Sequence, residues 1–349
     1  MKVIDIKIDT LDIPFNVSFE HSSSSRSATQ AILVTVITTN RHRGIGEGCP
    51  RSYVTGESIE TAKNFFNSYR DFFITVSSVS QLKEWILSNQ RLIDKNPAAF
   101  CAIEIALLNA MSLERNTTVE ALLSLPKLKG RFHYTGVIGS SKPEVFSNQY
   151  KQYINLGFND FKIKLFGKKE IDSKNISTLK NNPPHNIRVR FDANNLWSKA
   201  DDAIEYIQHL DYPLFALEEP LKSGQYQDSI TVSNALNSKI ILDESFTCEA
   251  NFNEIRNTPA SWIINIRVSK MGGILRSLSI ANLALELNIP IIIGAQVGET
   301  SILTRAALTV ANNYRNILIA QEGAFGTHLL KNDIIEPPIM FGKNGWLDI

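Results

Sequence analysis

Cysteine is scarce in this sequence, and long apolar runs are missing. The three cysteines, Cys49, Cys101 and Cys248, are too few and too scattered for a disulfide framework or a zinc site with regular spacing. Free thiols favour a reducing compartment, so we expect a cytoplasmic protein. No apolar run approaches the roughly 18 residues that a membrane span needs. The first residues, MKVIDIKIDT, alternate as a strand does and do not form a signal peptide.

An excess of charge of either sign is also missing. Lysine and arginine number 36 against 35 acidic residues, which gives a net charge of +1. This balance gives no sign of nucleic acid or an acidic membrane surface as a partner. A length of 349 residues, with 43% hydrophobic residues, is enough for one large core and a smaller domain. We therefore expect a globular enzyme that acts on a small-molecule substrate.

Residues 1–125 are expected to form an α+β domain. Residues 1–12 alternate apolar and polar side chains, and residues 31–39 form a second predicted strand. The segment 43–50, RGIGEGCP, has turn glycines that lead into a third strand. Helical patterns follow, and the last of them begins at Pro97 and is apolar all round, which predicts a buried helix.

Two polar loops interrupt this domain. Residues 21–30 are serine-rich and contain Arg26, and residues 51–57 contain Tyr53. A lone loop arginine is usually solvated, whereas a functional arginine in a lid would clamp a carboxylate with both of its terminal nitrogens. Loops of this kind close active sites in other enzymes, but nothing within the segment decides between the two interpretations.

Residues 126–330 have a different pattern, in which short apolar runs alternate with amphipathic stretches about 25 residues apart. The eight runs are residues 133–139, 158–165, 187–194, 215–220, 239–245, 262–268, 290–296 and 317–323. Alternating β and α units predict an α/β fold with a parallel sheet, and eight units favour a modified (β/α)8 TIM-type barrel. The remaining residues, 331–349, are expected to return to the N-terminal capping domain.

Charged residues gather at the carboxyl ends of these runs, where such barrels place their active sites. Lys162 and Lys164 lie two apart in an apolar run, so they share one face of a strand. Burying two like charges on one face is costly unless anions lie nearby. Asp192, Glu218 and Asp243 lie at the ends of the next three runs and supply those anions.

Lys270 follows the sixth run. Strands two and six of an eight-stranded barrel face each other, so Lys164 and Lys270 should approach a central ligand from opposite sides. Asp192, Glu218 and Asp243 would lie on the arc between them. Three carboxylates leave open positions on an octahedral Mg²⁺, so we predict a magnesium site formed by these acids.

A single acid at a strand end is more often a helix cap or an ion-pair partner than a metal ligand. Three acids on consecutive strands, with lysines on both sides, form a much more specific signal. Strand alternation directs only one of Glu218 and Glu219 inward, and we assign Glu218 as the ligand and Glu219 to a supporting role. Asn194 shares a face with Asp192 and is expected to orient ligands.

A metal between two opposed lysines suits removal of a proton α to a carboxylate. Mg²⁺ would stabilise the enediolate as charge develops, and clustered positive charge would lower the pKa of a lysine base. The combination of a lysine base, Mg²⁺ and an enediolate is the general enolase-superfamily pattern, not a deduction from these residues alone. Two bases allow a 1,1-proton transfer that inverts a stereocentre, whereas one base suits β-elimination or cycloisomerisation.

The motifs, taken in order, resemble the muconate-lactonising subgroup of the enolase superfamily. The matching stretches are FKIKL, Asp192-Ala193-Asn194, Glu218-Glu219-Pro220, Asp243-Glu244-Ser245, and Ile264-Asn265-Ile266 leading to Lys270-Met271-Gly272-Gly273-Ile274. The resemblance covers nearly the whole chain and implies a capping domain, a modified barrel, Mg²⁺ and a homo-oligomer. Within the subgroup the chain is most similar to dipeptide epimerases, in particular L-Ala-D/L-Glu epimerases.

The resemblance also implies roles for single residues. Lys164 and Lys270 match the two acid/base lysines. Arg26 matches the loop position that meets the acidic side chain of the substrate. Thr135 and Lys162 match substrate contacts.

Tyr53, Gln296 and Glu322 complete the predicted substrate contacts. The PRSYVTGE loop around Tyr53 resembles the corresponding loop of the epimerases. The chain departs from them at strand eight, where Gln321-Glu322-Gly323 replaces an Asp-x-Asp that binds the α-ammonium of the dipeptide. Strand seven ends at Gln296 more as it does in some cycloisomerases.

These features predict epimerisation of a dipeptide of the L-Ala-L-Glu type. A muconate-type cycloisomerase and an o-succinylbenzoate synthase are the alternatives. A non-catalytic binding protein on the same scaffold would have a broken set of site residues, whereas all three acids and both lysines are present here.

Overall fold

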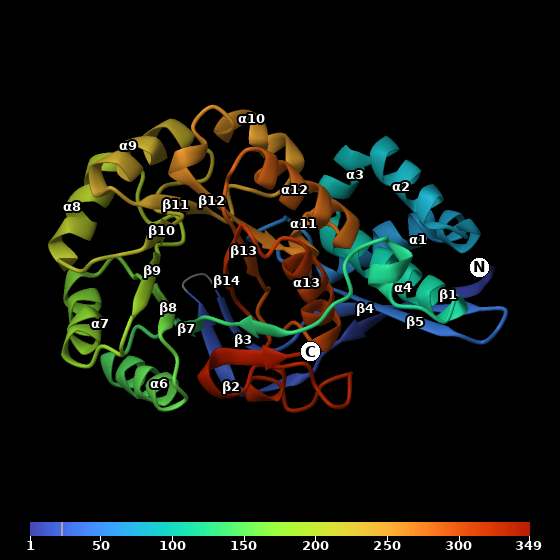
Figure 1. Cartoon of the computed structure of the whole chain (residues 1–349), viewed down its shortest axis with the longest axis horizontal. Helices are drawn as coiled ribbons and strands as arrows, with labels where there is room; N and C mark the ends of the chain where they lie inside the picture. Colours follow the sequence, from blue (N-terminus) through green and yellow to red (C-terminus); the bar gives the residue numbers. More distant parts are fainter. Residues whose placement is uncertain (22–23) are drawn as a thin grey trace.

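The computed structural model describes residues 1–21 and 24–349, and it begins with a small antiparallel sheet and a group of helices (Figure 1). The sheet has the order β1-β4-β5. Its strands are β1 (Val3–Leu11), β4 (Ala31–Thr38) and β5 (Arg43–Gly48). The helices that follow are α1 (Ile59–Thr75), α2 (Val79–Ser88), α3 (Gln90–Asp94), α4 (Pro97–Glu114) and α5 (Val119–Leu122). The α+β character predicted for this part of the chain is confirmed.

A hairpin between β1 and β4 is a feature that the sequence did not predict. It consists of β2 (Pro14–His21) and β3 (Ser24–Ala28), which pair antiparallel with Phe19 opposite Arg26. The expected loop over residues 21–30 is therefore wrong for His21 and for residues 24–28, and residues 22–23 lie outside the described residues. The segment SSRSA shows no apolar alternation, and within the described part of the chain β3 pairs only with β2, so composition gives no sign of this strand.

We had expected the glycines of β5 to be turn residues. They lie within the strand instead and allow a close approach between strand and helix. A Cβ atom on Gly46 would lie 2.1 Å from the carbonyl oxygen of Ala102 in α4, and one on Gly48 would lie 2.0 Å from that of Ala98. Gly44, one turn of the helix further on, meets α4 in the same way. Only residues without a side chain let this strand lie directly on the helix.

Helix α4 is long and apolar enough, by length and composition, to cross a membrane, so the expectation that no stretch approaches that length is wrong. The 18 residues of α4 are as apolar as a membrane span because small apolar residues dominate them and few charges interrupt them. In the structure 83% of these residues are buried inside the protein, as expected for a core helix.

An eight-stranded parallel sheet follows, in the order β14-β13-β12-β11-β10-β9-β8-β7. Its strands are β7 (Gly136–Ile138), β8 (Asp160–Lys164), β9 (Arg188–Asp192), β10 (Ala216–Glu218), β11 (Lys239–Leu242), β12 (Trp262–Arg267), β13 (Ile291–Gly294) and β14 (Leu318–Gln321). Each of the eight apolar runs contains one of these strands. The sheet curls (Figure 1), and where its two edges meet the amide of Thr135 donates to the carbonyl of Gln321 at 2.8 Å.

Helices cover the outer side of this sheet (Figure 1). They are α6 (Pro143–Asn155), α7 (Lys169–Asn181), α8 (Ala200–Leu210), α9 (Tyr226–Leu236), α10 (Phe252–Ile255), α11 (Val268–Met271), α12 (Ile274–Glu286) and α13 (Ser301–Asn313). Short 3₁₀ turns cover Glu249–Asn251, Pro259–Ser261, Gly326–His328 and Lys343–Gly345. The alternation of strands and helices agrees with the spacing of apolar and amphipathic stretches in the sequence.

Buried glutamates join the N-terminal part to the parallel sheet. Glu104 of α4 accepts hydrogen bonds from the amides of Ile274 (2.5 Å) and Leu275 (3.0 Å) at the start of α12. Glu47 of β5 accepts from the amide (3.0 Å) and hydroxyl (2.6 Å) of Thr300 at the start of α13. Burial raises the pKa of Glu104 to about 8 and that of Glu47 to about 7. Carboxyl groups at helix N-termini are favourable partners for the free amides there.

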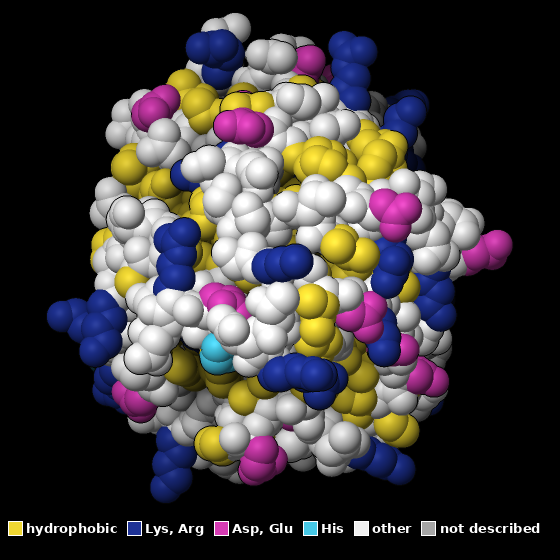
Figure 2. Space-filling model, turned by 90° about the vertical axis from the view of Figure 1, so that its right-hand side faces the viewer, with side chains coloured by type: hydrophobic (Ala, Val, Ile, Leu, Met, Phe, Trp, Pro, Cys, Tyr) yellow, Lys and Arg dark blue, Asp and Glu magenta, His cyan; other side chains and the backbone are white. Residues whose placement is uncertain are grey.

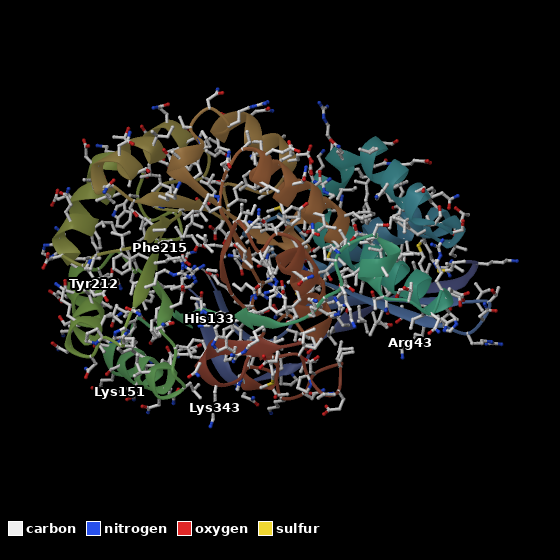
Figure 3. The ribbon with its side chains drawn as sticks, viewed as in Figure 1. Arg43, His133, Lys151, Tyr212, Phe215 and Lys343 are labelled. Carbon is white, nitrogen blue, oxygen red and sulfur yellow. The ribbon has the colours of Figure 1, made fainter. Side chains whose placement is uncertain are left out.

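The C-terminal segment contacts both parts of the chain. Strand β15 (Trp346–Asp348) pairs antiparallel with β6 (Arg131–His133), which ends at the residue labelled His133 in Figure 3. The ring centres of His133 and Trp346 lie 4.8 Å apart. The amide of Lys331 donates to the carbonyl of Pro14 in β2 at 2.9 Å. On the molecular face that Figure 2 shows, basic and acidic side chains are interspersed, in keeping with the net charge of +1.

The contact between β5 and α4 gives a first prediction. We expect Gly46→Ala to lower the free energy of unfolding by about 3 kcal/mol, because the new Cβ meets helix backbone that cannot move aside. In Gly342→Ala, the matched control, the new Cβ would lie 3.6 Å from the carbonyl oxygen of Trp346, an ordinary contact. Urea denaturation measures both; equal midpoints for Gly46→Ala and the wild type would contradict the prediction.

Candidate active site

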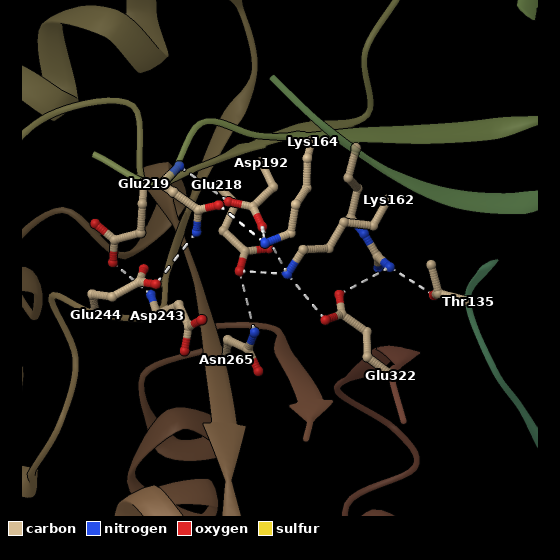
Figure 4. A network of polar contacts seen from close by, with 12 residues as sticks. Thr135, Lys162, Lys164, Asp192, Glu218, Glu219, Asp243, Glu244, Asn265 and Glu322 are labelled. Atoms are coloured by element: carbon tan, nitrogen blue, oxygen red, sulfur yellow. Dashed lines mark hydrogen bonds and ion pairs between the residues drawn. The ribbon is translucent and has the colours of Figure 1, made fainter. Parts of the chain in front are cut away.

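Four buried charged side chains meet at the carboxyl ends of β8, β9 and β10 (Figure 4). In the parallel register Lys164 lies beside Asp192, and Asp192 lies beside Glu218. The ammonium of Lys162 is 2.7 Å from Oε1 of Glu218 and 3.4 Å from Oδ2 of Asp192. The ammonium of Lys164 is farther away, at 4.0 Å from Oδ2 of Asp192. The structure thus places both lysines of FKIKL beside carboxylates.

Asp243 and Lys270 form a second pair on the other side of these acids. The Lys270 ammonium donates to Oδ1 of Asp243 at 2.8 Å and to the carbonyl oxygen of Asn265 at 2.9 Å. Asp243 and Lys270 are both almost completely buried. Oδ2 of Asp243 forms an ion pair with Arg267. Because β9, β10 and β11 separate β8 from β12 in the sheet, Lys164 and Lys270 reach the acids from opposite ends of the arc.

The three lysines differ in their protonation. Burial opposes the charge of Lys162, but Asp192 and Glu218 outweigh it and raise the pKa of this ammonium above its usual range. Burial lowers the pKa of Lys164 to about 8, and Lys162 adds to the effect while Asp192 opposes it. Burial also lowers the pKa of Lys270 well below its usual range. Lys162 therefore stays charged, while Lys164 and Lys270 are closer to the neutral form that a base requires.

Glu218, the last residue of β10, and Glu219, which follows the strand, have different partners. Glu218 receives the Lys162 ammonium, whereas Glu219 accepts from the amides of Asp243 (2.6 Å) and Ser245 (2.7 Å). The backbone of Glu219 is left-handed, with φ of 41°. Glu219 thus holds the turn after β11, which positions Asp243 and its neighbours.

The acids at this end of the sheet have the oxygen donors that a magnesium ion prefers. Buried oxygens on Glu218 and Glu244 have no hydrogen-bond partner, and hard carboxylate oxygens are the ligands that Mg²⁺ prefers. Burial, together with repulsion from neighbouring acids, raises the pKa of Glu218 to about 7 and that of Glu244 to about 8. Among residues 1–21 and 24–349, no three His, Cys, Asp or Glu residues are arranged to hold a metal directly. Binding of Mg²⁺ there requires the ion pairs between Lys162 and Glu218 and between Arg267 and Asp243 to break.

A pocket of about 90 Å³ lies over this end of the sheet. Seven of the residues singled out from the sequence line it: Tyr53, Lys162, Lys164, Asp192, Asn194, Gln296 and Glu322. Val297, Phe325 and Leu329 give it an apolar wall. The pocket therefore combines a charged floor with apolar sides, as small-molecule sites commonly do.

Thr135 lies outside the lining of this pocket. Its hydroxyl donates to Oδ1 of Asp160 at 2.8 Å and accepts from Arg190 at 2.6 Å. Arg190 is fully buried and also lies 3.4 Å from Oε1 of Glu322. The other oxygen of Glu322 is 3.1 Å from the Lys162 ammonium. Glu322 is thus shared between two cations, and Thr135 belongs to the network beneath it.

Arg26 lies behind Tyr53, not in the pocket lining. Its guanidinium carbon is 5.8 Å from the centre of the Tyr53 ring, and Nη1 donates to Oε1 of Gln30 at 2.6 Å. Tyr53 of the 51–57 loop thus lines the pocket, and Arg26 of strand β3 lies against the Tyr53 ring.

Sequence reasoning missed two arginines. Arg267 lines the pocket and donates to Oε1 of Gln296 at 3.0 Å. It is the last residue of β12, so the rule that singled out the other strand ends would have found it. Arg190 interrupts the apolar run of β9 as Lys162 interrupts that of β8, and the same reasoning about buried charge applies to it.

The chain is similar in sequence to known proteins over most of its length. Residues 146–347, more than half of the chain, match the family model described as Enolase C-terminal domain-like. The hydrophobic dipeptide epimerase of Enterococcus faecalis is 26% identical over 336 residues, which is 93% of this chain and 92% of that protein. The L-Ala-D/L-Glu epimerase of Clostridium acetobutylicum is 23% identical over 314 residues, which is 89% of this chain and 87% of that protein.

Solved structures show the same fold. The substrate-liganded L-Ala-D/L-Glu epimerase from Bacillus subtilis has a TM-score of 0.88 at 21% identity, covering 100% of this chain and 96% of that one. The dipeptide epimerase from Enterococcus faecalis, complexed with Mg and L-Leu-L-Tyr, has a TM-score of 0.85 at 24% identity, covering 100% and 97%. The 2-chloromuconate cycloisomerase from Rhodococcus opacus has a TM-score of 0.87 at 22% identity, covering 100% and 94%. All three carry the modified barrel with its N-terminal part, so the fold alone does not separate epimerase from cycloisomerase.

Proposed function

The chain belongs to the Enolase C-terminal domain-like family, and on this premise we propose that it is a Mg²⁺-dependent dipeptide epimerase of the L-Ala-L-Glu type. The observation that carries the proposal is the pair of buried lysines with lowered pKa, Lys164 and Lys270, at opposite ends of an arc of acids. A pair of opposed bases is what inversion of a stereocentre needs, whereas a cycloisomerase or a dehydratase needs only one. In this proposal residues 1–125 close the site, residues 126–330 carry its chemistry and residues 331–349 return to the cap.

The proton transfer follows from the positions of the two lysines. Lys164, whose pKa is lowered to about 8 by burial, takes the α-proton of the C-terminal residue from one face. Lys270, in its ammonium form, gives its own proton to the opposite face, so the two lysines exchange protonation states. The roles reverse for the other enantiomer. Both are held in place, Lys164 by the side chain of Asn194 at 3.2 Å and Lys270 by Asp243 and the Asn265 carbonyl.

The remaining residues bind and neutralise the substrate. Mg²⁺ held by Asp192, Glu218 and Asp243 would stabilise the negative charge that develops on the substrate carboxylate. Lys162, whose pKa is raised by its acidic neighbours, stays charged and binds the same carboxylate.

The substrate class rests on the relatives and on the loops. The relatives from Enterococcus faecalis and Clostridium acetobutylicum are named as dipeptide epimerases, which supports a dipeptide over a muconate-type diacid. Tyr53, Gln296 and Glu322 line the pocket and would contact the dipeptide beyond its reacting carbon. Arg26, next to Tyr53, would attract an acidic side chain once the loop moves inward.

The activity can be tested by isotope exchange. Incubation of L-Ala-L-Glu and related dipeptides with the protein and Mg²⁺ in D₂O should place one deuterium on the α-carbon of the C-terminal residue and yield both diastereomers. The L-Ala-D-Glu diastereomer should exchange as well, because the two bases act in both directions. Proton NMR and mass spectrometry measure the exchange. Turnover of a muconate-type diacid without exchange of any dipeptide would rule the proposal out.

Binding of Mg²⁺ can be tested without an activity measurement. We expect Mg²⁺ to raise the melting temperature by several degrees, because a ligand at about 100 times its Kd adds roughly 2.7 kcal/mol to the stability. Asp192→Asn should lose most of this rise, whereas Asp228→Asn, an exposed acid on α9, should keep it. Thermal unfolding with Mg²⁺ or with a chelator measures the difference. An unchanged melting temperature in the wild type, or a full rise in Asp192→Asn, would contradict the assignment.

A further inference from the structure

Arg51 is fully buried beside the pocket, and the hydrogen-bond acceptors of its guanidinium are backbone carbonyls. Nη1 donates to the carbonyls of Gln30 (3.0 Å) and Pro50 (2.8 Å). Nη2 donates to those of Thr29 (3.2 Å) and Val297 (2.7 Å). None of the ion pairs in the described part of the chain involves Arg51. Buried guanidinium groups usually pair with an acid because their desolvation is costly, so this choice of partners needs a reason.

The four carbonyls belong to three separate loops. Thr29 and Gln30 follow the hairpin strand β3, Pro50 opens the 51–57 loop, and Val297 lies in the loop after β13. The chain separation between Arg51 and its partners reaches 246 residues. A planar fork with donors at fixed angles can hold several carbonyls at set distances, which a single ammonium cannot do.

Each of the three loops carries or contacts one of the proposed substrate residues. Gln30 accepts a hydrogen bond from Arg26 at 2.6 Å, so the first loop holds Arg26. Tyr53 lies in the second loop, two residues after Arg51, and the third loop places Gln296 next to Val297. The position of the Arg51 guanidinium therefore determines how far apart Arg26, Tyr53 and Gln296 lie.

Hydrogen bonds also tie the 51–57 loop to Arg51. The backbone carbonyl of Arg51 accepts from the amides of Val54 (3.0 Å) and Thr55 (2.9 Å), and the Thr55 hydroxyl donates to Glu57 at 2.9 Å. Arg51 thus bonds to its own loop through its backbone carbonyl and to the other two loops through its guanidinium.

The pocket that these loops border is small. Its volume of about 90 Å³ is well below the roughly 300 Å³ at which small-molecule sites begin. A dipeptide needs more room than this, and any separation of the loops would break hydrogen bonds of Arg51. Their formation again on closure returns the three loops to the same spacing.

We propose that Arg51 is a positioning residue that fixes the closed arrangement of the three substrate loops. It touches neither the two lysines nor the acids, so it acts on substrate binding and leaves the proton transfer to the residues of the sheet. The kinetic consequence rests on the proposed function, whereas the effect on the loops does not.

The loop effect is tested by hydrogen exchange of the full-length protein. In Arg51→Met, amides in residues 24–31, 50–57 and 295–300 should exchange at least about tenfold faster, because their shared contact is lost. Amides of β8, β9 and β10 should be unchanged. Arg51→Lys keeps the charge but not the fork, so it should also accelerate the three segments. Arg70→Met, on α1, removes an arginine that bonds the carbonyl of Ile6 and pairs with Asp5, and it should leave all three segments as in the wild type.

The kinetic effect is tested with whichever substrate the isotope exchange identifies. Both Arg51 variants should raise KM about tenfold or more and change kcat by less than about threefold. A fall in kcat at constant KM would overturn the proposal, and so would loop exchange equal to the wild type in both variants. Faster exchange spread over the whole chain would assign Arg51 a general structural role instead. If Arg51→Met does not fold, the hydrogen exchange of Arg51→Lys tests the proposal. If no substrate is found, hydrogen exchange still tests whether Arg51 holds the three loops, and this result does not depend on the proposed function.

Discussion

Buried opposite charges at the carboxyl ends of the parallel strands are the constraint on which the site depends. None of these groups would be tolerated alone in a low-dielectric interior, and each is stabilised only by its neighbours. Distance decides what each lysine does. Lys162 lies 2.7 Å from Glu218 and is held in its charged form, whereas Lys164 lies 4.0 Å from its closest acid and has a pKa lowered to about 8. Two lysines on the same face of one strand thus acquire opposite properties.

The N-terminal part of the chain completes the site by contacts that are themselves buried and polar. Glu47 and Glu104 bind the first turns of α13 and α12, and the glycine row of β5 brings that strand onto α4. Arg51 then ties loops of both parts together over the pocket. The rigid sheet therefore carries the reacting groups, while adjustable loops carry the groups that meet the rest of the substrate, a division common to barrels of this kind.

The sequence predicted those parts of the molecule that follow from local pattern. The spacing of apolar runs gave all eight parallel strands, and the strand ends led to Lys162, Lys164, Asp192 and Glu218, which the structure brings together. The strand β3 escaped prediction because its pairing leaves no trace in a serine-rich composition. The partners of Thr135 and the four carbonyls around Arg51 escaped it because they come from residues far apart in the chain. Contacts of this kind depend on how loops close over the sheet, and no periodicity encodes them.

The central claim is that Lys164 and Lys270 act on opposite faces of one carbon, and single-lysine variants test it most directly. Exchange of the α-proton with D₂O is followed for each diastereomer of the dipeptide separately, in Lys164→Ala, in Lys270→Ala and in the control Lys169→Ala, an exposed lysine on α7. The account predicts that both site variants lose epimerisation, and that each keeps exchange with one diastereomer only, opposite in the two variants. The control should match the wild type. Two-way epimerisation at full rate in both site variants, or loss of exchange with the same diastereomer in both, would contradict it.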